Sequence, residues 1–253
     1  MSPSKKTSKG CVVLLQITEQ EMLDYIYCPT YYDIKYNSKI DLKEQPTLKI
    51  LLNKIAKYFY FHMLNGKICT MNELKTKWDQ ICSKHADVID QKKNLEGIGL
   101  IHKMLLWASR EHITILDIET KYAINTQTVE LTGNLPAITS PREGQYEILI
   151  TDFSNRLQEP SMLNMNLKYT LSSYGFKCAY NQDPLGIKIH NIKNNKDIKT
   201  IRKDNDYLRL RSAIESVGYG IKNNVFYPRE LNCHKCAAYD YCRYWNKETR
   251  KDV

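Results

Sequence analysis

The feature that most constrains this chain is a cysteine cluster near its C-terminal end. Residues 233–242 read CHKCAAYDYC and place Cys233, Cys236 and Cys242 at the spacing Cx2Cx5C. Three thiolates are one ligand short of the four that a closed tetrahedral site requires. The cluster therefore predicts a fourth cysteine elsewhere in the chain and a loop that a metal group holds in place.

Cys28 is the best candidate for that fourth ligand. It lies in the sequence YCPTYYDIKY, at the predicted end of a helix and directly before a proline. The other cysteines lie singly in surroundings typical of core residues: Cys11, Cys69, Cys82 and Cys178. Eight cysteines in 253 residues do not resemble a small secreted disulfide scaffold, so we expect a reducing, cytoplasmic environment.

Charge and hydropathy narrow the classes of partner. The net charge of +9 favours a polyanion, nucleic acid first and an acidic membrane surface second. The basic start MSPSKKTSKG is followed by only seven apolar residues and no cleavage site, so a signal peptide is not expected. No run of 18 apolar residues occurs, which argues against a membrane span. The Lys- and Asn-rich composition would suit an AT-rich genome, such as a viral one.

The first third of the chain is predicted to be helical. Two capping boxes, Thr18 with Glu21 and Thr70 with Glu73, mark the starts of helices. Apolar residues at helical spacing predict two further helices, over about 47–65 and 94–110.

The pattern then changes to the alternation of β-strands. Three stretches rich in β-branched residues predict three strands: ITILDIETKYAI, TVELTG and YEILITDFS. A helix is predicted after Pro160, followed by short strands near 176–180 and 185–190. A basic loop and a helix from about Asp204 to Ile221 complete the prediction.

No internal repeat or long linker interrupts this order, which favours one α/β domain over residues 16–245. Its expected parts are a helical part at about 18–111, a sheet core at about 112–222 and a cysteine clasp at 228–245. Residues 1–15 are expected to form a basic tail and a first strand, and residues 246–253 a C-terminal tail.

The motifs together resemble the iron–sulfur members of the PD-(D/E)XK nuclease superfamily. These are the RecB-like exonucleases, including the CRISPR-associated adaptation exonucleases, and the nuclease domain of the AddB helicase-nucleases. CPTYY matches their Cys-Pro-x-x-Tyr context, and YPRELNCHKCAAYDYC matches their last three cysteines. The order ILDIETKYAI, VELTGNLPAI, YEILITDFSN, NLKYTLSSYGFK also agrees, so the resemblance covers about residues 16–245.

The resemblance implies a restriction-endonuclease-like fold, in which helices flank a central mixed sheet. It adds an N-terminal helical insertion and a metal-clasped C-terminal loop. It also implies a [4Fe–4S] cluster bound by four cysteines: Cys28, Cys233, Cys236 and Cys242. A structural zinc ion is the alternative that the cysteines leave open. Either group would join the start of the domain to its end.

The catalytic motifs of the superfamily are degenerate here. Pro136 stands where GxxD requires a metal-binding aspartate, and Ser154 stands where the lysine follows the retained Asp152. Met165 occupies the expected glutamine position, whereas Tyr169 is retained. The resemblance therefore implies a pseudo-nuclease with weak Mg²⁺ binding or none.

Two other acids were considered as replacements for the missing aspartate. Glu147 is separated from Asp152 by an odd number of strand positions and should face away from it. Glu119, on the preceding predicted strand, is the acid that could compensate, although an exposed structural glutamate is the alternative.

DNA binding would not require catalysis. The stretch KIHNIKNNKDIKTIRK, residues 188–203, could follow a phosphate backbone, with a solvated loop as the alternative. The candidate contacts are Lys188, Lys193, Lys196, Lys199, Arg202, Lys203, Arg209 and Arg211.

The sequence leaves three functions open. The first is a nuclease-inactive iron–sulfur protein that binds DNA in recombination, repair or replication, as a non-catalytic subunit. The second is a divergent Mg²⁺- or Mn²⁺-dependent exonuclease. The third is a protein-interaction subunit of a larger complex, without DNA affinity of its own.

Overall fold

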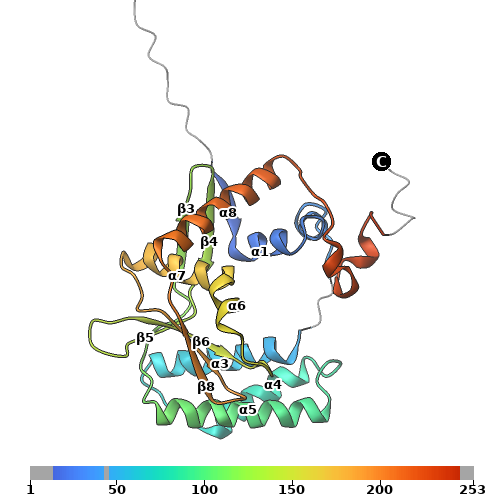
Figure 1. Ribbon diagram of the computed structural model, residues 1–253. Helices are drawn as coiled ribbons and strands as arrows, with labels where there is room; N and C mark the ends of the chain where they lie inside the picture. Colours follow the sequence, from blue (N-terminus) through green and yellow to red (C-terminus); the bar gives the residue numbers. More distant parts are fainter. Residues whose placement is uncertain (1–13, 43–45, 246–253) are drawn as a thin grey trace, which may run out of the picture.

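The structure is a computed structural model that describes residues 14–42 and 46–245 (Figure 1). Most of the predicted basic tail, including Cys11, and the whole predicted tail 246–253 lie outside the described residues. The α-helices are α1 (Glu19–Tyr27), α2 (Pro29–Tyr32), α3 (Leu48–Leu64), α4 (Met71–Ser83), α5 (Gln91–Arg110), α6 (Pro160–Met165), α7 (Leu167–Tyr180) and α8 (Asp204–Lys222). Shorter helical turns are η1 (Asp33–Asn37), η2 (Glu230–Lys235) and η3 (Tyr239–Tyr241).

The strands form two mixed sheets. They are β1 (Leu15–Thr18), β2 (Ile115–Asp117), β3 (Lys121–Asn125), β4 (Val129–Asn134), β5 (Ala137–Thr139), β6 (Glu147–Asp152), β7 (Ile187–Asn191) and β8 (Lys196–Thr200). The smaller sheet has the order β1-β4-β3, and the larger has the order β2-β5-β6-β7-β8. β1 is parallel to β4 and β6 is parallel to β7, whereas the other pairs are antiparallel.

The two sheets are connected through one bent ribbon. β2 leads into β3 and β4 leads into β5, so the same two chain segments pair in both sheets. Between the sheets the pairing continues, because Glu119 N donates to Leu135 O at 3.1 Å and Leu135 N donates to Thr120 O at 2.9 Å. Pro136 follows at the bend between β4 and β5, where it has no N–H group to donate to a ladder.

β6 shows why the larger sheet needs helices on both faces. Neighbouring side chains of a strand point to opposite faces. Accordingly, Ile148 packs into a core with α1, α7 and α8, while Leu149 packs into a second core with α3, α4 and α5. Figure 1 shows α3, α4 and α5 grouped on one side of the sheet. A buried third cluster contains Cys28, Tyr31, Ile34 and Cys242, and it joins α2 and η1 to the C-terminal loop.

The predicted fold class, α/β with mixed sheets flanked by helices, is confirmed. Both predicted capping boxes form, at Thr18 and Thr70. Two local predictions were wrong. Residues 176–180 belong to helix α7, since Phe176 is buried on its core side, and the predicted basic loop contains strand β8. Within the described residues, no helix is both long and apolar enough to cross a membrane.

Candidate functional site

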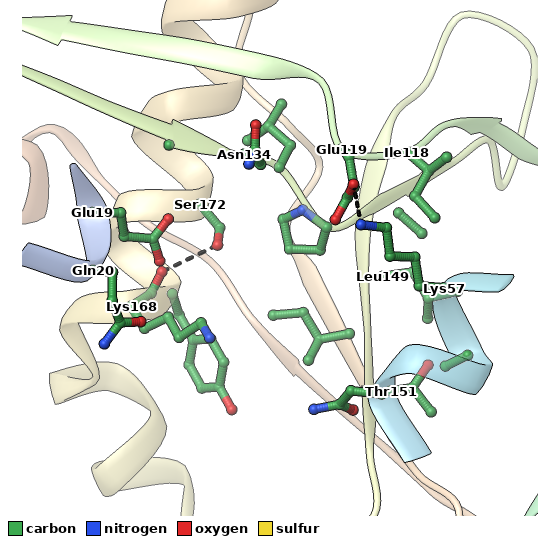
Figure 2. A pocket seen from close by; sticks show the side chains of 18 of the residues that line it. Glu19, Gln20, Lys57, Ile118, Glu119, Asn134, Leu149, Thr151, Lys168 and Ser172 are labelled. Carbon is green, nitrogen blue, oxygen red and sulfur yellow. Dashed lines mark hydrogen bonds and ion pairs between the residues drawn. The ribbon is translucent and has the colours of Figure 1, made fainter. Parts of the chain in front are cut away.

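A cleft of about 1230 Å³ opens between α3, the bent ribbon and α7. Figure 2 shows Glu19 and Lys168 on one wall and the ion pair of Lys57 with Glu119 on the other. The floor includes Leu149 and Thr151 of β6. The cleft thus lies where the superfamily resemblance predicted the degenerate catalytic strands.

The structure brings most of the degenerate motif positions together. Pro136, Asp152 and Tyr169 all line the cleft, and Ser154 bonds to Asp152. Met165 does not belong to this set, because it is 78% exposed at the end of α6. Gln158 lines the cleft instead, and its Oε1 accepts a hydrogen bond from Tyr169 Oη at 3.3 Å. The glutamine beside the tyrosine therefore comes from the loop before α6.

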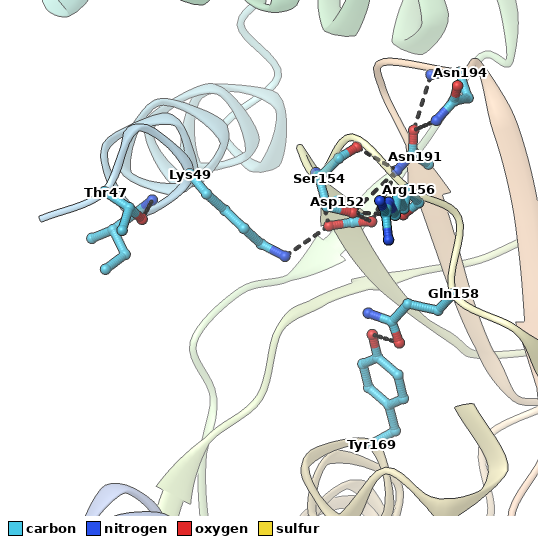
Figure 3. A network of polar contacts seen from close by, with 10 residues as sticks. Thr47, Lys49, Asp152, Ser154, Arg156, Gln158, Tyr169, Asn191 and Asn194 are labelled. Atoms are coloured by element: carbon cyan, nitrogen blue, oxygen red, sulfur yellow. Dashed lines mark hydrogen bonds and ion pairs between the residues drawn. The ribbon is translucent and has the colours of Figure 1, made fainter. Parts of the chain in front are cut away.

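Asp152 is buried and its carboxylate is fully hydrogen-bonded (Figure 3). Oδ1 accepts from Lys49 Nζ at 2.8 Å and from Ser154 N at 3.1 Å. Oδ2 accepts from Ser154 Oγ at 2.5 Å and from Asn191 Nδ2 at 2.9 Å. An ionised carboxylate has about four lone-pair sites, and four donors occupy them here. The carboxylate has no free site for a cation in this arrangement.

The same contacts set the protonation of Asp152. Burial raises the pKa of the carboxyl, but hydrogen bonds from Lys49, Ser154 and Asn191 lower it, and the lowering wins. The pKa of Asp152 therefore lies below its ordinary value, and the group is a carboxylate at neutral pH. Sequence reasoning missed Lys49, which comes from α3 and places an ammonium group beside Asp152.

The other two acids of the cleft, Glu119 and Glu19, are ion-paired and hydrogen-bonded, respectively. Glu119 forms an ion pair with Lys57. Glu19 accepts a hydrogen bond from Tyr122 Oη at 2.8 Å, and burial raises its pKa more than Tyr122 and Lys168 lower it. Glu147 does not line the cleft, in agreement with its predicted orientation, and Lys199 Nζ lies 2.7 Å from its Oε1.

Lysines outnumber acids in the cleft. Five lysines and three carboxylates line it, the lysines being Lys49, Lys54, Lys57, Lys121 and Lys168. Among the described residues, Lys54, Lys121 and Lys168 have no ion-pair partner, and all three are exposed. These lysines come from α3, β3 and α7, so they are far apart in the sequence and form no cluster there.

The predicted DNA contacts lie elsewhere, and none of the eight lines the cleft. Three of them, on or near the β7–β8 hairpin, are held by acids: Lys188 by Asp197 at 2.8 Å, Lys193 by Glu96 at 3.0 Å and Lys199 by Glu147 at 2.7 Å. Four are exposed and have no ion pair with a described residue: Lys196, Lys203, Arg209 and Arg211.

Arg202 has to be removed from the predicted contacts. It is only 6% exposed, and its guanidinium donates to Thr170 Oγ1 at 2.9 Å, to Thr200 Oγ1 at 2.5 Å and to Leu163 O at 2.6 Å. Because its donors already bond inside the protein, Arg202 holds α6 and α7 against the sheet and cannot reach a phosphate.

The four predicted cysteine ligands converge on one buried cavity. Cys28, Cys233, Cys236 and Cys242 all line it, and none of them forms a disulfide. Burial raises the pKa of the Cys236 and Cys242 thiols, and the neighbouring cysteines raise it further. The other described cysteines, Cys69, Cys82 and Cys178, lie outside this cavity.

Two N–H groups already point at the sulfurs of this cavity. Arg229 N donates to Cys28 Sγ at 3.4 Å, and Trp245 Nε1 donates to Cys233 Sγ at 3.1 Å. Thr30 is also among the residues that line the cavity, and its hydroxyl is buried and has no hydrogen-bond partner among the described residues. Four thiols and two directed N–H groups fit a group that four thiolates would bind.

The cavity that the four cysteines line is small and admits about one water-sized sphere. No three histidine, cysteine, aspartate or glutamate side chains in the described part of the chain are arranged to hold a metal ion.

The fold is similar to that of a solved candidate exonuclease. A candidate exonuclease from Eubacterium rectale aligns with a TM-score of 0.54 and 11% sequence identity, over 90% of this chain and 87% of that chain. The structure of SSO0001 aligns with a TM-score of 0.45 and 10% identity, over 90% and 86% of the two chains, and carries no argument at that score. No family model matches the chain, and no curated protein matches its sequence.

Proposed function

We propose that this protein is a nuclease-like DNA-binding protein of the iron–sulfur PD-(D/E)XK type that does not hydrolyse DNA. The proposed setting is recombination, repair or replication, where it would serve as a non-catalytic subunit. The similarity to the Eubacterium rectale protein supports a nuclease-like fold, while the remaining steps rest on the cleft and the cysteines.

The main support for the absence of hydrolysis is that hydrogen bonds occupy both carboxylate oxygens of Asp152. Metal-dependent hydrolysis requires carboxylate oxygens that hold a divalent ion at the phosphate. Here the side chain of Pro136 has no oxygen atom, and four donors occupy both oxygens of Asp152. The site therefore does not fit a magnesium ion, and Lys49 supplies the positive charge beside Asp152.

The charge of the cleft supports DNA as the partner. Lys54, Lys121 and Lys168 line one opening, and their ammonium groups have no ion-pair partner in the part of the chain that the structure describes. Such groups bind phosphates without sequence preference, and each contact adds salt-dependent affinity. Tyr60, Tyr122 and Tyr169 also line the cleft, but each has its hydroxyl bonded to the protein, so we assign the affinity to the lysines.

The resemblance to the iron–sulfur nucleases favours a [4Fe–4S] cluster over zinc, whereas four cysteines around one cavity fit either group. Cys28, Cys233, Cys236 and Cys242 would hold the cluster, which would join α1 and α2 to the C-terminal loop. When bound, the cluster supplies a rigid four-thiolate link and one-electron redox chemistry.

The proposal is tested on protein purified anaerobically. Labelled single- and double-stranded DNA should bind with an affinity that falls as KCl rises, and the DNA should stay intact in Mg²⁺ or Mn²⁺. Iron and sulfide should both be present, at about four of each per chain. Absence of salt-sensitive binding to either DNA would refute the DNA-binding part.

An active nuclease is the second candidate, and one observation favours it. Glu19, Glu119 and Asp152 line a single cleft, and Lys49 could act as the missing motif lysine. Release of the Lys57 and Lys49 ion pairs by DNA would then have to free two carboxylates. Degradation of DNA in Mn²⁺ that disappears in Asp152→Ala would establish this alternative.

A further inference from the structure

The exposed aromatic side chains gather near the C-terminal end of the described chain. Seven aromatic residues are exposed in the part that the structure describes, and six of them are Tyr27 and members of the segment 219–245. The tyrosines that line the cleft, in contrast, are all buried: Tyr60, Tyr122 and Tyr169. The cleft thus offers phosphate contacts but little ring surface on which a nucleic-acid base could stack, whereas the C-terminal segment offers several rings.

Three of these rings lie around one turn. Tyr27 Oη donates to Asn232 O at 3.3 Å, and Trp245 Nε1 donates to Cys233 Sγ at 3.1 Å. Tyr239 and Trp245 line the same small cavity as Cys233. These bonds tie the polar edges of Tyr27 and Trp245 to the protein, yet Trp245 remains 43% exposed. Rings that are held in place lose little conformational entropy when a ligand stacks on them. Tyr27, Tyr239 and Trp245 together form the aromatic surface.

Cations accompany the aromatic surface. Arg229, Lys235 and Arg243 are exposed and form no ion pair with a described residue. Two exposed acids, Glu230 and Asp240, lie in the same segment, so the cations are in excess. Exposed rings beside excess cations fit single-stranded DNA, because its bases are free to stack and its phosphates attract the cations.

Helix α1 connects the aromatic surface to the cleft (Figure 1). Glu19, its first residue, lines the cleft, and Tyr27 is its last residue. At a rise of 1.5 Å per residue the two ends of this helix are roughly 12 Å apart. A strand that leaves the cleft along α1 would therefore reach the aromatic surface within a few nucleotides.

We propose that Tyr27, Tyr239 and Trp245 stack against bases of single-stranded DNA that extends from the cleft. This inference rests on the proposed binding of DNA, and it does not depend on which group the cysteines bind. The bases of duplex DNA already stack on one another inside the helix. The aromatic surface therefore adds affinity for single strands and gives the protein a preference for them over duplexes.

The first test compares single- and double-stranded DNA in anisotropy titrations of the full chain. For an oligothymidylate of about 20 nucleotides, Tyr239→Ala should raise the Kd about tenfold, the loss of one stacked base. The Kd for a duplex of the same length should not change. Tyr239→Phe keeps the ring and should bind both DNAs like the wild type. Leu231→Ala is the matched control, since Leu231 is 89% exposed in the same segment but has no ring, and it should change neither Kd.

Tryptophan fluorescence gives a second readout that needs no variant. The chain has three tryptophans, and Trp78 and Trp107 are buried, so Trp245 is the one that a bound strand can reach. The oligothymidylate should quench its emission, because a base stacked on the indole ring quenches it. An abasic strand of the same length has the phosphates without the bases and should not quench. Equal quenching by both strands, or by neither, would overturn the stacking. If Tyr239→Ala does not fold, this measurement decides.

The outcomes separate this inference from the proposed function. A loss of affinity in Lys54→Ala but not in Tyr239→Ala, without base-dependent quenching, would overturn the aromatic surface and leave a DNA-binding cleft. Weaker binding in Leu231→Ala but not in Tyr239→Ala would show that apolar contact rather than stacking acts here, which would also overturn the inference. Wild-type protein that binds neither DNA would overturn the proposed function and this inference together.

Discussion

Lys49 Nζ lies 2.8 Å from Asp152 Oδ1, although 103 positions separate the two residues in the chain. This ion pair joins α3 to the end of β6 across the cleft, and it occupies the carboxylate that a nuclease would use for metal. The Lys49 side chain is 46% exposed and that of Asp152 is 5% exposed, so the pair is buried on one side only.

The first prediction concerns the stability that Asp152 provides. Asp152→Ala removes the acceptor of four hydrogen bonds and leaves a buried gap beside Asn191, which should lower the free energy of unfolding by about 2–3 kcal/mol. Lys49→Ala should cost only about 0–1 kcal/mol, because its exposed ammonium is screened by water. Anaerobic urea unfolding measures both. Equal effects of the two variants would contradict this account.

The second prediction is the pH dependence of the same network. The folded-state pKa of Asp152 lies below its ordinary value of about 3.9, so its stabilisation is present above that value. It is lost as the pH falls through the folded pKa. We expect the stability advantage of the wild type over Asp152→Asn to be constant from pH 7 to about pH 5 and to shrink at lower pH. An advantage that grows on acidification would mean that the pKa is raised.

Local sequence signals predicted much of the fold. Thr18 and Thr70 marked helix starts because capping acts within one helical turn. β8 was missed since its sequence, KDIKT, is charged, as is common in an edge strand with an exposed face. Residues 176–180 were assigned to a strand because apolar side chains alternate there, but α7 continues through them and buries Phe176.

The site was only partly predictable. The cysteines carry a spacing that points to their chemistry, so their sharing of a cavity could be predicted from the sequence. Lys49 and Gln158 could not, because each reaches the cleft from a different element and only the tertiary fold brings it near Asp152 or Tyr169. Pro136 marks a lost ligand in the sequence, and the structure adds that it lies at the bend between β4 and β5.

The third prediction locates the DNA-binding surface. Alanine at Lys54, Lys121 or Lys168 should each reduce the slope of log K against log salt by roughly 0.7–0.9, the value for one phosphate contact. Lys196→Ala and Lys203→Ala are matched controls, because both lysines are exposed but lie outside the cleft. The slopes come from anisotropy titrations at several KCl concentrations. Loss confined to the two control variants would move the interface to the surface formed by β8 and the start of α8.

The fourth prediction tests the cysteine cavity. Cys28→Ser should lose most of the iron and lower the thermal midpoint, because Cys28 alone connects the N-terminal helices to the other three ligands. Cys178→Ser is the matched control, since this cysteine is exposed and does not line the cavity. Iron and sulfide analysis of both proteins tests whether Cys28 is a ligand. Full iron content in Cys28→Ser would exclude it as a ligand.

The fifth prediction concerns the packing behind the cleft. Tyr122 lies against Gly133 and Gly175, and its hydroxyl bonds to Glu19. A Cβ on Gly175 would approach ring atoms of Tyr122 to 2.7 Å, so Gly175→Ala must push the ring from its place. We expect a loss of about 2–3 kcal/mol in the free energy of unfolding.

A second helical glycine provides the control for this prediction. Gly99 lies inside α5 with nothing within 4 Å of an added Cβ, so Gly99→Ala should stabilise the protein by about 0.5–1 kcal/mol. Because both substitutions are Gly→Ala in a helix, helix propensity cancels between them, and the difference reports the contact with Tyr122. Stabilisation of both variants in urea unfolding would show that Tyr122 moves at little cost and does not fix Glu19.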